Sequence, residues 1–277
     1  MIRADLHTHT YYSDGGQSPK EVITAAKGRG VKLVSITDHD SAEGCKEGAA
    51  CAKEAGISFV DGVEVSAYQG DIKVHMLCYG MDYCSPEYIA FAKKRLEGAE
   101  ERTFDVLKKL SAVGVNIEYG EVLRERKSKE SPIHGMYIAR AGARKGYAAS
   151  PVDFFARYLN YGKPGFSCLC RPTPEETVQL CAKCSGFSSL AHPGRISADE
   201  EWVNKLILNL KEHGLGGIEA VYSGHTDRQT QYYKGLAERY SLLVTGGSDT
   251  HYKEGNRKIG DPCFYASEEL LSALKIK

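Results

Sequence analysis

Short apolar segments recur along this chain of 277 residues, and most of them are followed directly by a histidine or a carboxylate. The segments cover residues 2–6, 33–37, 57–63, 73–79, 187–191, 217–221 and 242–245. Several are separated by helix-like stretches, such as the one that begins with a serine cap and a proline at Ser18-Pro19. Alternating strands and helices predict a mostly parallel sheet. Reactive residues at successive strand ends favour a closed α/β barrel, and an open doubly wound sheet is the alternative.

Residues 85–165 break this alternation of strands and helices. The stretch is charged, has a helical pattern over residues 90–110, and is interrupted by several glycines and a proline. We therefore expect an inserted helical subdomain at 85–165, with the barrel formed by residues 1–84 and 166–277. Insertions on the catalytic face of a barrel commonly cover the active site and determine the substrate.

The overall charge is balanced, with 36 basic and 36 acidic residues. Such a balance gives no field that would favour long nucleic acids or a membrane surface as partners. The chain starts with no basic and apolar leader pattern and has no apolar run long enough to cross a bilayer, so a soluble, cytoplasmic protein is expected.

The nine cysteines are an odd number in a chain that is too large to need disulfides, which favours reduced thiols. Cys168 and Cys170, followed by Cys181 and Cys184, could together hold a structural zinc. The run at 173–180 carries a helix cap, a proline and early acidic residues, so Cys181 and Cys184 are more simply helix residues.

Two pairs of potential metal ligands lie near the two ends of the chain. His7 and His9 are two residues apart after the first apolar segment, so on a strand they face the same side. Asp249 and His251 repeat this spacing after the last segment, behind two glycines. One such pair alone could be a hydrogen-bonded strand end, but closure of a barrel would bring the two pairs together.

The intervening segments carry the same chemistry. His39 follows the second segment, Glu64 the third, His75 lies within the fourth and His192 follows the fifth. Each residue alone has a simple structural explanation, because a carboxylate at a strand end is usually solvated and a single histidine is usually a hydrogen-bonded core residue. Their coincidence at successive strands predicts a polynuclear metal site, since buried imidazoles and carboxylates need a partner or a metal.

These motifs closely resemble those of the polymerase and histidinol phosphatase (PHP) phosphoesterases. The matching stretches are 5–9, 37–39, Glu64, His75, 191–194 and 247–251, and they follow the family's order over nearly the whole chain. The resemblance implies a distorted (β/α)7, TIM-like barrel with a trinuclear site at the carboxyl ends of the strands.

The resemblance also implies three overlapping ligand sets. His7, His9, Glu64 and Asp249 would hold the first ion, Glu64 with His75 and His192 the second, and Asp14, His39 and His251 the third. Some family members have a histidine in place of Asp14, which keeps a metal-binding side chain there. Asp5 and Asp38 are expected to orient the ligand imidazoles.

Carboxylate and imidazole ligands suit Mn²⁺, Fe²⁺ or Zn²⁺, and the sequence does not rank these three ions. Clustered divalent ions acidify water and clamp a phosphoryl group, so the expected reaction is hydrolysis of a phosphate ester by a metal-bridging hydroxide. The sequence has neither a Gly-x-Ser-x-Gly elbow nor a Cys-x5-Arg loop, so it does not support a covalent enzyme intermediate.

The substrate contacts are expected at Arg195, His225 and Arg140, with His225 and Asp249 as catalytic residues. Arg195 and His225 resemble phosphate-binding or proton-donating residues of the nucleotide phosphatase branch. In the run that contains Arg140, Gly135 and Tyr137 stand where such relatives have an arginine and a histidine. This departure makes a small sugar phosphate or a cyclic phosphate diester credible beside a nucleotide.

Three other functions are weighed against this one. A nucleoside 3′,5′-bisphosphate phosphatase or a single-strand 5′–3′ exonuclease would keep the same chemistry, and seventeen tyrosines could supply stacking surfaces for an exonuclease. A non-catalytic PHP regulatory or binding module would be expected to lack ligands, whereas all nine positions carry ligand-type residues here.

Overall fold

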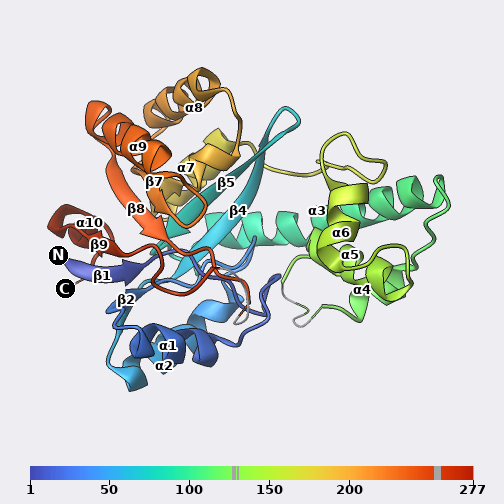
Figure 1. Ribbon diagram of the computed structural model, residues 1–277, viewed down its shortest axis with the longest axis horizontal. Coiled ribbons are helices and arrows are strands. Elements are labelled where there is room, and N and C mark those ends of the chain that lie inside the picture. Colours follow the sequence, from blue (N-terminus) through green and yellow to red (C-terminus); the bar gives the residue numbers. More distant parts are fainter. Residues whose placement is uncertain (127–128, 130, 253–256, 277) are drawn as a thin grey trace.

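The computed structural model describes residues 1–126, 129, 131–252 and 257–276, and it shows a mixed α/β protein (Figure 1). Within these residues the strands form one sheet of four strands, in the order β3-β2-β1-β9, and one of five, in the order β4-β5-β6-β7-β8. The strands are β1 (Ile2–Asp5), β2 (Leu33–Val34), β3 (Ser58–Phe59), β4 (Gly62–Gln69), β5 (Ile72–Tyr79), β6 (Phe187–Leu190), β7 (Gly217–Tyr222), β8 (Leu243–Gly247) and β9 (Phe264–Ala266).

Each predicted apolar segment contains a strand, but the third one was read incorrectly. Residues 57–63 split into the short strand β3 and the start of β4, which forms an antiparallel hairpin with β5. Gly70 makes the turn with a φ of 60°, a conformation that glycine adopts without strain. Strand β9 was not predicted, and it pairs antiparallel with β1. The sheets are therefore more mixed than the alternation of strands and helices indicated.

The two sheets meet near the carboxyl end of β1. The amide of Leu6 donates to the carbonyl of Gly246 over 3.0 Å, and the amide of Asp249 donates to the carbonyl of His7 over 2.8 Å. A second contact joins His39 to Glu64 through an isolated bridge between the sheets. These contacts bring the first and last parallel strands together, as expected, although the sheet hydrogen bonding does not by itself establish a closed (β/α)7 barrel.

Amphipathic helices cover the outer faces of the sheets. α1 begins with a capping box in which Ser18 and Glu21 satisfy each other's backbone amides, and the predicted helix at Cys181 is α7, whose cap is Thr173. The largest apolar cluster packs β4 to β7 against α7, α8 and α9. The helices are α1 (Pro19–Gly28), α2 (Glu43–Ala55), α7 (Pro174–Lys183), α8 (Glu200–Glu212), α9 (Asp227–Arg239), α10 (Glu268–Ala273) and the 3₁₀ turn η2 (Pro193–Arg195).

The described part of residues 85–165 contains five helical elements, and Figure 1 shows α4, α5 and α6 to one side of the sheets, with α3 running toward them from beneath β4. They share an apolar cluster of their own, in which Val106 and Leu110 pack near Tyr137 and Phe154. The elements are α3 (Pro86–Ser111), α4 (Tyr119–Leu123), α5 (Gly135–Arg144), α6 (Pro151–Phe154) and the π-helical turn η1 (Phe155–Leu159). Among the described residues, no helix is both long and apolar enough to cross a membrane.

Candidate metal centre

The seam between β1 and β8 brings the two terminal ligand pairs together. The Nε2 atoms of His7 and His9 lie 3.1 Å apart, and Oδ1 of Asp249 lies 3.5 Å and 3.3 Å from them. A side chain at Gly247 would overlap His7, so the glycine there allows the two backbones to approach each other. The other carboxylate oxygen of Asp249 accepts hydrogen bonds from Tyr222 and Arg257, which fixes Oδ1 toward the histidines.

Glu64 lies at the middle of the cluster and is almost completely buried, with 1% of its surface exposed. Its Oε1 lies 2.7 Å from Nδ1 of His75 and 3.0 Å from Nε2 of His192. Its Oε2 lies 3.0 Å from Nδ1 of His39, 3.2 Å from Nε2 of His9 and 3.4 Å from Nε2 of His7. A single carboxylate thus faces imidazoles from both sheets, which is the geometry a bridging ligand requires.

Asp14, His39 and His251 gather on the other side of His9. Oδ1 of Asp14 lies 3.3 Å from Nε2 of His251, and Oδ2 of Asp14 lies 3.8 Å from Nε2 of His39. The rings of His9 and His251 are stacked with their centroids 4.2 Å apart. The structure therefore brings all nine expected ligand residues into one cluster, in which His75 and His251 are partly exposed and the others are buried.

The donor atoms of this cluster fit divalent cations. Ligand-type atoms within 4.8 Å of one another form four overlapping groups, in which His7, His9, His39 and Glu64 each belong to two. The groups are His9, Asp14, His39 and His251; His7, His9 and Asp249; His7, Glu64 and His192; and His39, Glu64 and His75. Within the described residues, several buried ring nitrogens also lack a hydrogen-bond partner, among them Nδ1 of His9 and Nδ1 of His192. Unpartnered buried polar atoms are costly, and cations would satisfy them.

The electrostatics of the cluster keep Glu64 ionised and His75 neutral, as metal ligands need, but favour a proton on His9. Burial would raise the pKa of Glu64, but His75, His39 and His7 hold it well below its ordinary range. Burial lowers the pKa of His75 to about 3 and keeps its ring neutral despite the nearby Glu64. Burial would also lower the pKa of His9, but hydrogen bonds with Asp249 and Glu64 raise it to about 10. Bound cations would replace the proton that His9 otherwise holds.

Glu219 is a residue of this site that the sequence reasoning missed. It is fully buried in β7, where Oε1 lies 2.9 Å from Nδ1 of His7 and Oε2 accepts the amide of His192 over 2.7 Å. His192 has a φ of 27°, which is a strained conformation for a residue with a side chain. Glu64 was predicted because it follows an apolar segment, whereas Glu219 lies inside one, so the same pattern did not select it.

The expected role of Asp5 and Asp38 was wrong in its detail. The carboxylate of Asp5 accepts backbone amides, from Ser248 over 2.9 Å and Gly260 over 2.7 Å. The carboxylate of Asp38 accepts the amide and hydroxyl of Thr10 over 2.7 Å and 2.6 Å. Both side chains therefore fix the loops that carry the ligands. Contacts with backbone amides cannot be read from residue spacing, which is why these roles were misassigned.

His134 is the second missed residue, and it reaches the site from the segment 85–165. Its ring stacks on that of His39 with centroids 4.7 Å apart and an angle of 6° between the planes. Nδ1 of His134 accepts the amide of Met136 over 3.3 Å at the start of α5. Burial lowers the pKa of His134 to about 4, although Asp14 opposes the shift. A histidine directly before a helix gave no signal of its own in the sequence.

Arg195 and Arg140 lie on two sides of the cluster. Arg195 is half-exposed, donates to the hydroxyl of Tyr222 over 2.9 Å and approaches Oδ2 of Asp249 at 3.6 Å. Arg140 donates to the carbonyl of Asp14 over 2.9 Å and to the hydroxyl of Tyr252 over 3.0 Å. Both positions are compatible with the expected contacts to the substrate, which remain predictions.

His225 has both ring nitrogens engaged. Nδ1 lies 3.1 Å from the carbonyl of Ala220, to which it can donate, and Nε2 accepts the amide of Gly194 over 3.1 Å. Burial lowers the pKa of His225. The ring thus holds the turn after His192 in this arrangement. Its predicted role as a proton donor would require release of the amide of Gly194.

A cleft of about 430 Å³ opens beside the cluster. Its lining includes His75, His192 and Arg195 on one side and Met136 and Phe155 on the other. A second hollow of about 560 Å³ lies next to Asp14 and His251 and is lined by Arg140, Tyr11 and Tyr252. A substrate at the cluster would therefore touch both the sheet portion and the helical segment.

The PHP domain family matches residues 5–213 of the chain. The chain is 33% identical to a 3′,5′-nucleoside bisphosphate phosphatase of Chromobacterium violaceum, over 94% of this chain and 91% of that protein. It is 30% identical to a 5′-3′ exoribonuclease of Haemophilus influenzae, with 92% of both chains covered. It is 29% identical to a phosphoribosyl 1,2-cyclic phosphate 1,2-diphosphodiesterase of Eggerthella lenta, over 91% and 95%.

A solved structure has a similar fold. It is an amidohydrolase from Chromobacterium violaceum with bound sulfate and no metal, and it superposes with a TM-score of 0.85 at 31% identity. The superposition covers 96% of this chain and 92% of that one.

Proposed function

We propose that this chain, which belongs to the PHP domain family and is a metal-dependent phosphoesterase, hydrolyses a small phosphorylated metabolite at a centre of three divalent ions. The observation that carries the proposal is the position of Glu64, whose two oxygens face the imidazoles of five histidines. One ion would lie at His7, His9, Glu64 and Asp249, a second at Glu64, His75 and His192, and a third at Asp14, His39 and His251. Manganese, iron and zinc all suit these donors.

Bound ions of this kind acidify water and neutralise the charge of a phosphoryl group, which hydrolysis of a phosphate ester requires. Side chains of the protein would contribute further charge neutralisation and proton transfer. The guanidinium of Arg195 borders the cleft next to Asp249 and can neutralise the oxygens of the phosphoryl group. Nε2 of His225 accepts the amide of Gly194, so the ring could donate a proton to the leaving oxygen of the ester only after it releases this bond and takes up a proton.

The helical segment 85–165 is proposed to act as a cap, and the two sheets as parts of one distorted (β/α)7 barrel. The cap is supported by the cleft, which Met136 and Phe155 line together with His75 and His192. The barrel is supported by the backbone contacts between β1 and the end of β8. A cap of this kind would exclude water and restrict the size of the substrate.

The substrate is proposed to be a nucleotide or another small phosphate ester. The names of the relatives refer to a nucleoside bisphosphate, a cyclic sugar phosphate and RNA. All three substrates are phosphate esters, but the group that carries the phosphate differs. Tyr11 and Tyr252 line the hollow beside Asp14 and could stack a base, which supports a nucleotide. This support offsets the missing arginine and histidine of the run before Arg140.

The test is to purify the protein, count its bound metals and measure phosphate release from three classes of ester. These are nucleoside bisphosphates, sugar phosphates and cyclic phosphate diesters, with a short RNA carrying a 5′-phosphate as the fourth substrate. We expect three ions per chain and release from at least one small ester at a higher kcat/KM than from RNA. Fewer than two tightly bound ions, together with no release from any ester, would contradict the proposal.

A further inference from the structure

We propose that a second anion site lies next to the metal centre and binds a second phosphate or carboxylate of the substrate. This inference rests on the proposed function and narrows it to esters that carry a further anionic group. The site is a small cavity between the hairpin β4–β5 and helix α3, and its cations are Lys73, Arg102 and Arg171. Together with Ser167, these three residues are called the cationic cavity below.

Its cations greatly outweigh the nearby negative charge. Asp40 is buried and binds two arginines through Oδ2: Arg95, at 3.2 Å, and Arg171. Arg102 is 6% exposed, and within the described part of the chain it makes no ion pair. Its two hydrogen bonds, to the carbonyls of Leu169 and Ile133, are both 3.4 Å long. One carboxylate therefore faces three arginines.

Lys73 adds a further positive charge at the edge of the cavity. Within the described residues, its ammonium has no carboxylate within 4 Å, and it lines the same cavity as Arg102 and Arg171. Burial and the neighbouring Arg171 lower the pKa of Arg102. Like charges that are buried side by side are costly, so a bound anion would stabilise both groups.

The cavity has a donor that is free to bind an anion. Within the described part of the chain, Nε of Arg171 is buried without a hydrogen-bond partner. The hydroxyl of Ser167 also lines the cavity and is shared with the carboxylate of Asp105. The space of about 50 Å³ exceeds the roughly 10–15 Å³ that one water molecule needs, so it can admit a group of several heavy atoms. An anion there could accept hydrogen bonds from Arg102 and Arg171 in the charge-assisted form that binds phosphate strongly.

The position of Lys73 connects this cavity to the metal centre. Lys73 and His75 are two residues apart on β5, so their side chains leave the same face of the strand. Lys73 lines both the cavity and the cleft that contains His75 and His192. His134 lines the cavity as well, and its ring stacks on His39. One small molecule could therefore place one phosphate at the metals and another anionic group among the cations.

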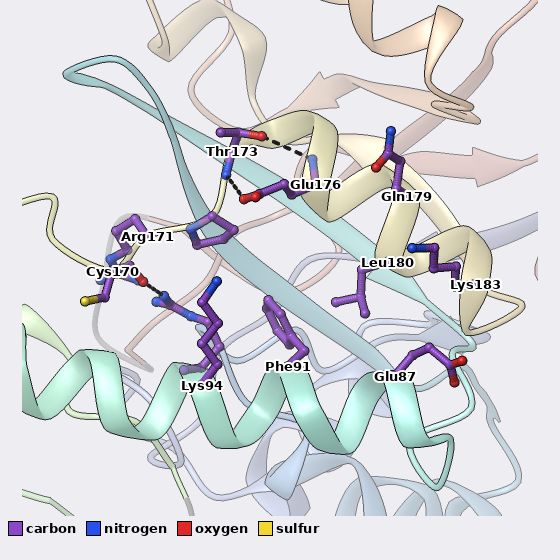
Figure 2. A pocket seen from close by; sticks show the side chains of 12 residues that line it. Glu87, Phe91, Lys94, Cys170, Arg171, Thr173, Glu176, Gln179, Leu180 and Lys183 are labelled. Carbon is purple, nitrogen blue, oxygen red and sulfur yellow. Dashed lines mark hydrogen bonds between the residues drawn. The ribbon is translucent and has the colours of Figure 1, made fainter.

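The far side of Arg171 faces a different groove, which Figure 2 shows between α3 and α7. Lys94 and Phe91 point into this groove from α3, and Lys183 lies at its other end on α7 (Figure 2). Lys94 directly precedes Arg95 but does not line the cationic cavity. It is therefore a matched control, because it is a cation on the same helix that lies outside the proposed site.

The experiment compares paired substrates with and without a second phosphate. Adenosine 3′,5′-bisphosphate is compared with adenosine 3′-phosphate, and glucose 1,6-bisphosphate with glucose 1-phosphate, using the metal-loaded protein. The measured quantity is the ratio of the two kcat/KM values in the better pair. We expect the unsubstituted protein to prefer the bisphosphate by about 10- to 100-fold, as charge-assisted hydrogen bonds to a phosphate would provide.

Arg171→Gln should lower this ratio about tenfold or more, whereas Arg171→Lys should restore part of it and Lys94→Gln should not change it. Lys73→Met provides a second variant that does not disturb the pair with Asp40. A ratio of kcat/KM values near one in the unsubstituted protein would overturn the inference. It would also be overturned if Arg171→Gln and Lys73→Met lowered kcat/KM equally for both substrates of the pair. If the unsubstituted protein hydrolyses neither member of either pair nor any other ester, the proposed function itself is refuted, and the inference falls with it.

Discussion

The metal centre and the cationic cavity lie next to each other, and the first has an excess of buried negative charge whereas the second has an excess of buried positive charge. In the metal centre, Glu64, Asp14 and Asp249 are buried among imidazoles and provide more negative charge than neutral histidines can balance. At the cationic cavity, Arg102 and Arg171 share a single nearby carboxylate, that of Asp40, which also pairs with Arg95 outside the cavity. Cations would balance the charge of one site and an anion that of the other, although Lys73 and His75 leave the same face of β5.

The difference shows how one small molecule could satisfy both sites. A buried charge is costly unless a group of opposite charge binds next to it. Each site therefore favours a ligand whose charge is opposite to its own. The metals would complete the first site before any substrate binds. The substrate would then be selected by its ability to bring an anion to the second site. Substitutions in the metal centre and in the cationic cavity should therefore impair the enzyme in different ways.

The largest effect should come from neutralising the centre of the metal site. Glu64→Gln removes the charge that faces five histidines but keeps the size of the side chain. We expect kcat to fall at least a thousandfold, about 4 kcal/mol in the barrier, and the bound metal to decrease. Steady-state kinetics and elemental analysis measure both. Glu212→Gln, on the exposed end of α8, is the matched control, and equal activity in the two variants would show that Glu64 is no ligand.

Asp14→Ala should cause a smaller and more selective loss. It removes the carboxylate between His39 and His251, so one of three ions should be lost while the other two remain. We expect kcat to fall about a hundredfold, because part of the electrostatic stabilisation survives. Metal counting after gel filtration checks the prediction, with Asp71→Ala, in an exposed turn, as the control. An unchanged metal count would exclude Asp14 from the ligand set.

Glu219→Gln tests whether the metal site depends on its supporting carboxylate. The carboxylate accepts hydrogen bonds from both His7 and the backbone of His192, whereas an amide has one acceptor oxygen and would present an NH₂ to the other donor. We expect metal affinity to weaken about 10- to 100-fold. Titration with Mn²⁺ or Zn²⁺ measures this change. The exposed Glu238→Gln is the control, and unaltered affinity in Glu219→Gln would mean that other contacts fix His7.

Arg195→Ala should weaken turnover without disturbing the metals. Arg195 is half-exposed and contacts Tyr222, so its removal leaves no buried charge without a partner. We expect kcat/KM to fall about tenfold, in keeping with one lost charge-assisted hydrogen bond, and Arg195→Lys to recover part of the loss. Kinetics and metal counting are measured on the same samples. Loss of metal would show that Arg195 supports the structure and does not contact the substrate.

The smallest effect is expected at the cysteines that first resembled a zinc site. Cys181 lies within α7 and Cys184 caps it, while Cys168 and Cys170 precede the helix. Cys168→Ser should change metal content and activity by no more than about twofold, as for most substitutions at partly exposed positions. Elemental analysis and a thermal melt check this expectation. A lost zinc ion, or a large fall in melting temperature, would revive the thiolate site.

The sequence was informative wherever chemistry followed a regular spacing. His7 with His9 and Asp249 with His251 have the spacing of a strand, so their convergence was predictable. Glu219 was missed because it lies within its strand, whereas the sequence pattern concerned reactive residues that follow a strand. His134 was missed because nothing in its surroundings indicated that α5 would stack it on His39.

The remaining features depend on contacts between segments that carry no common motif. Lys73, Arg102 and Arg171 come from a strand, a helix and a loop, and none of them follows a recognisable pattern. The hairpin β4–β5 was also missed, because an apolar run has the same appearance in a parallel and an antiparallel pair. Burial and partners, which only the fold reveals, distinguish these residues from ordinary surface charges.

The seam between β1 and β8 also determines when the metal site can exist. Asp249, whose amide binds the carbonyl of His7, is synthesised about 240 residues after His7 and His9. At roughly 5–20 residues per second, the first pair of ligands waits on the order of 10 to 50 s for its partner. During that time the growing chain offers histidines without the carboxylate that completes their ion site. The ion site of His7, His9 and Asp249 would therefore be completed only after residue 249 has been made, and the metal available at that moment would influence which ion it binds.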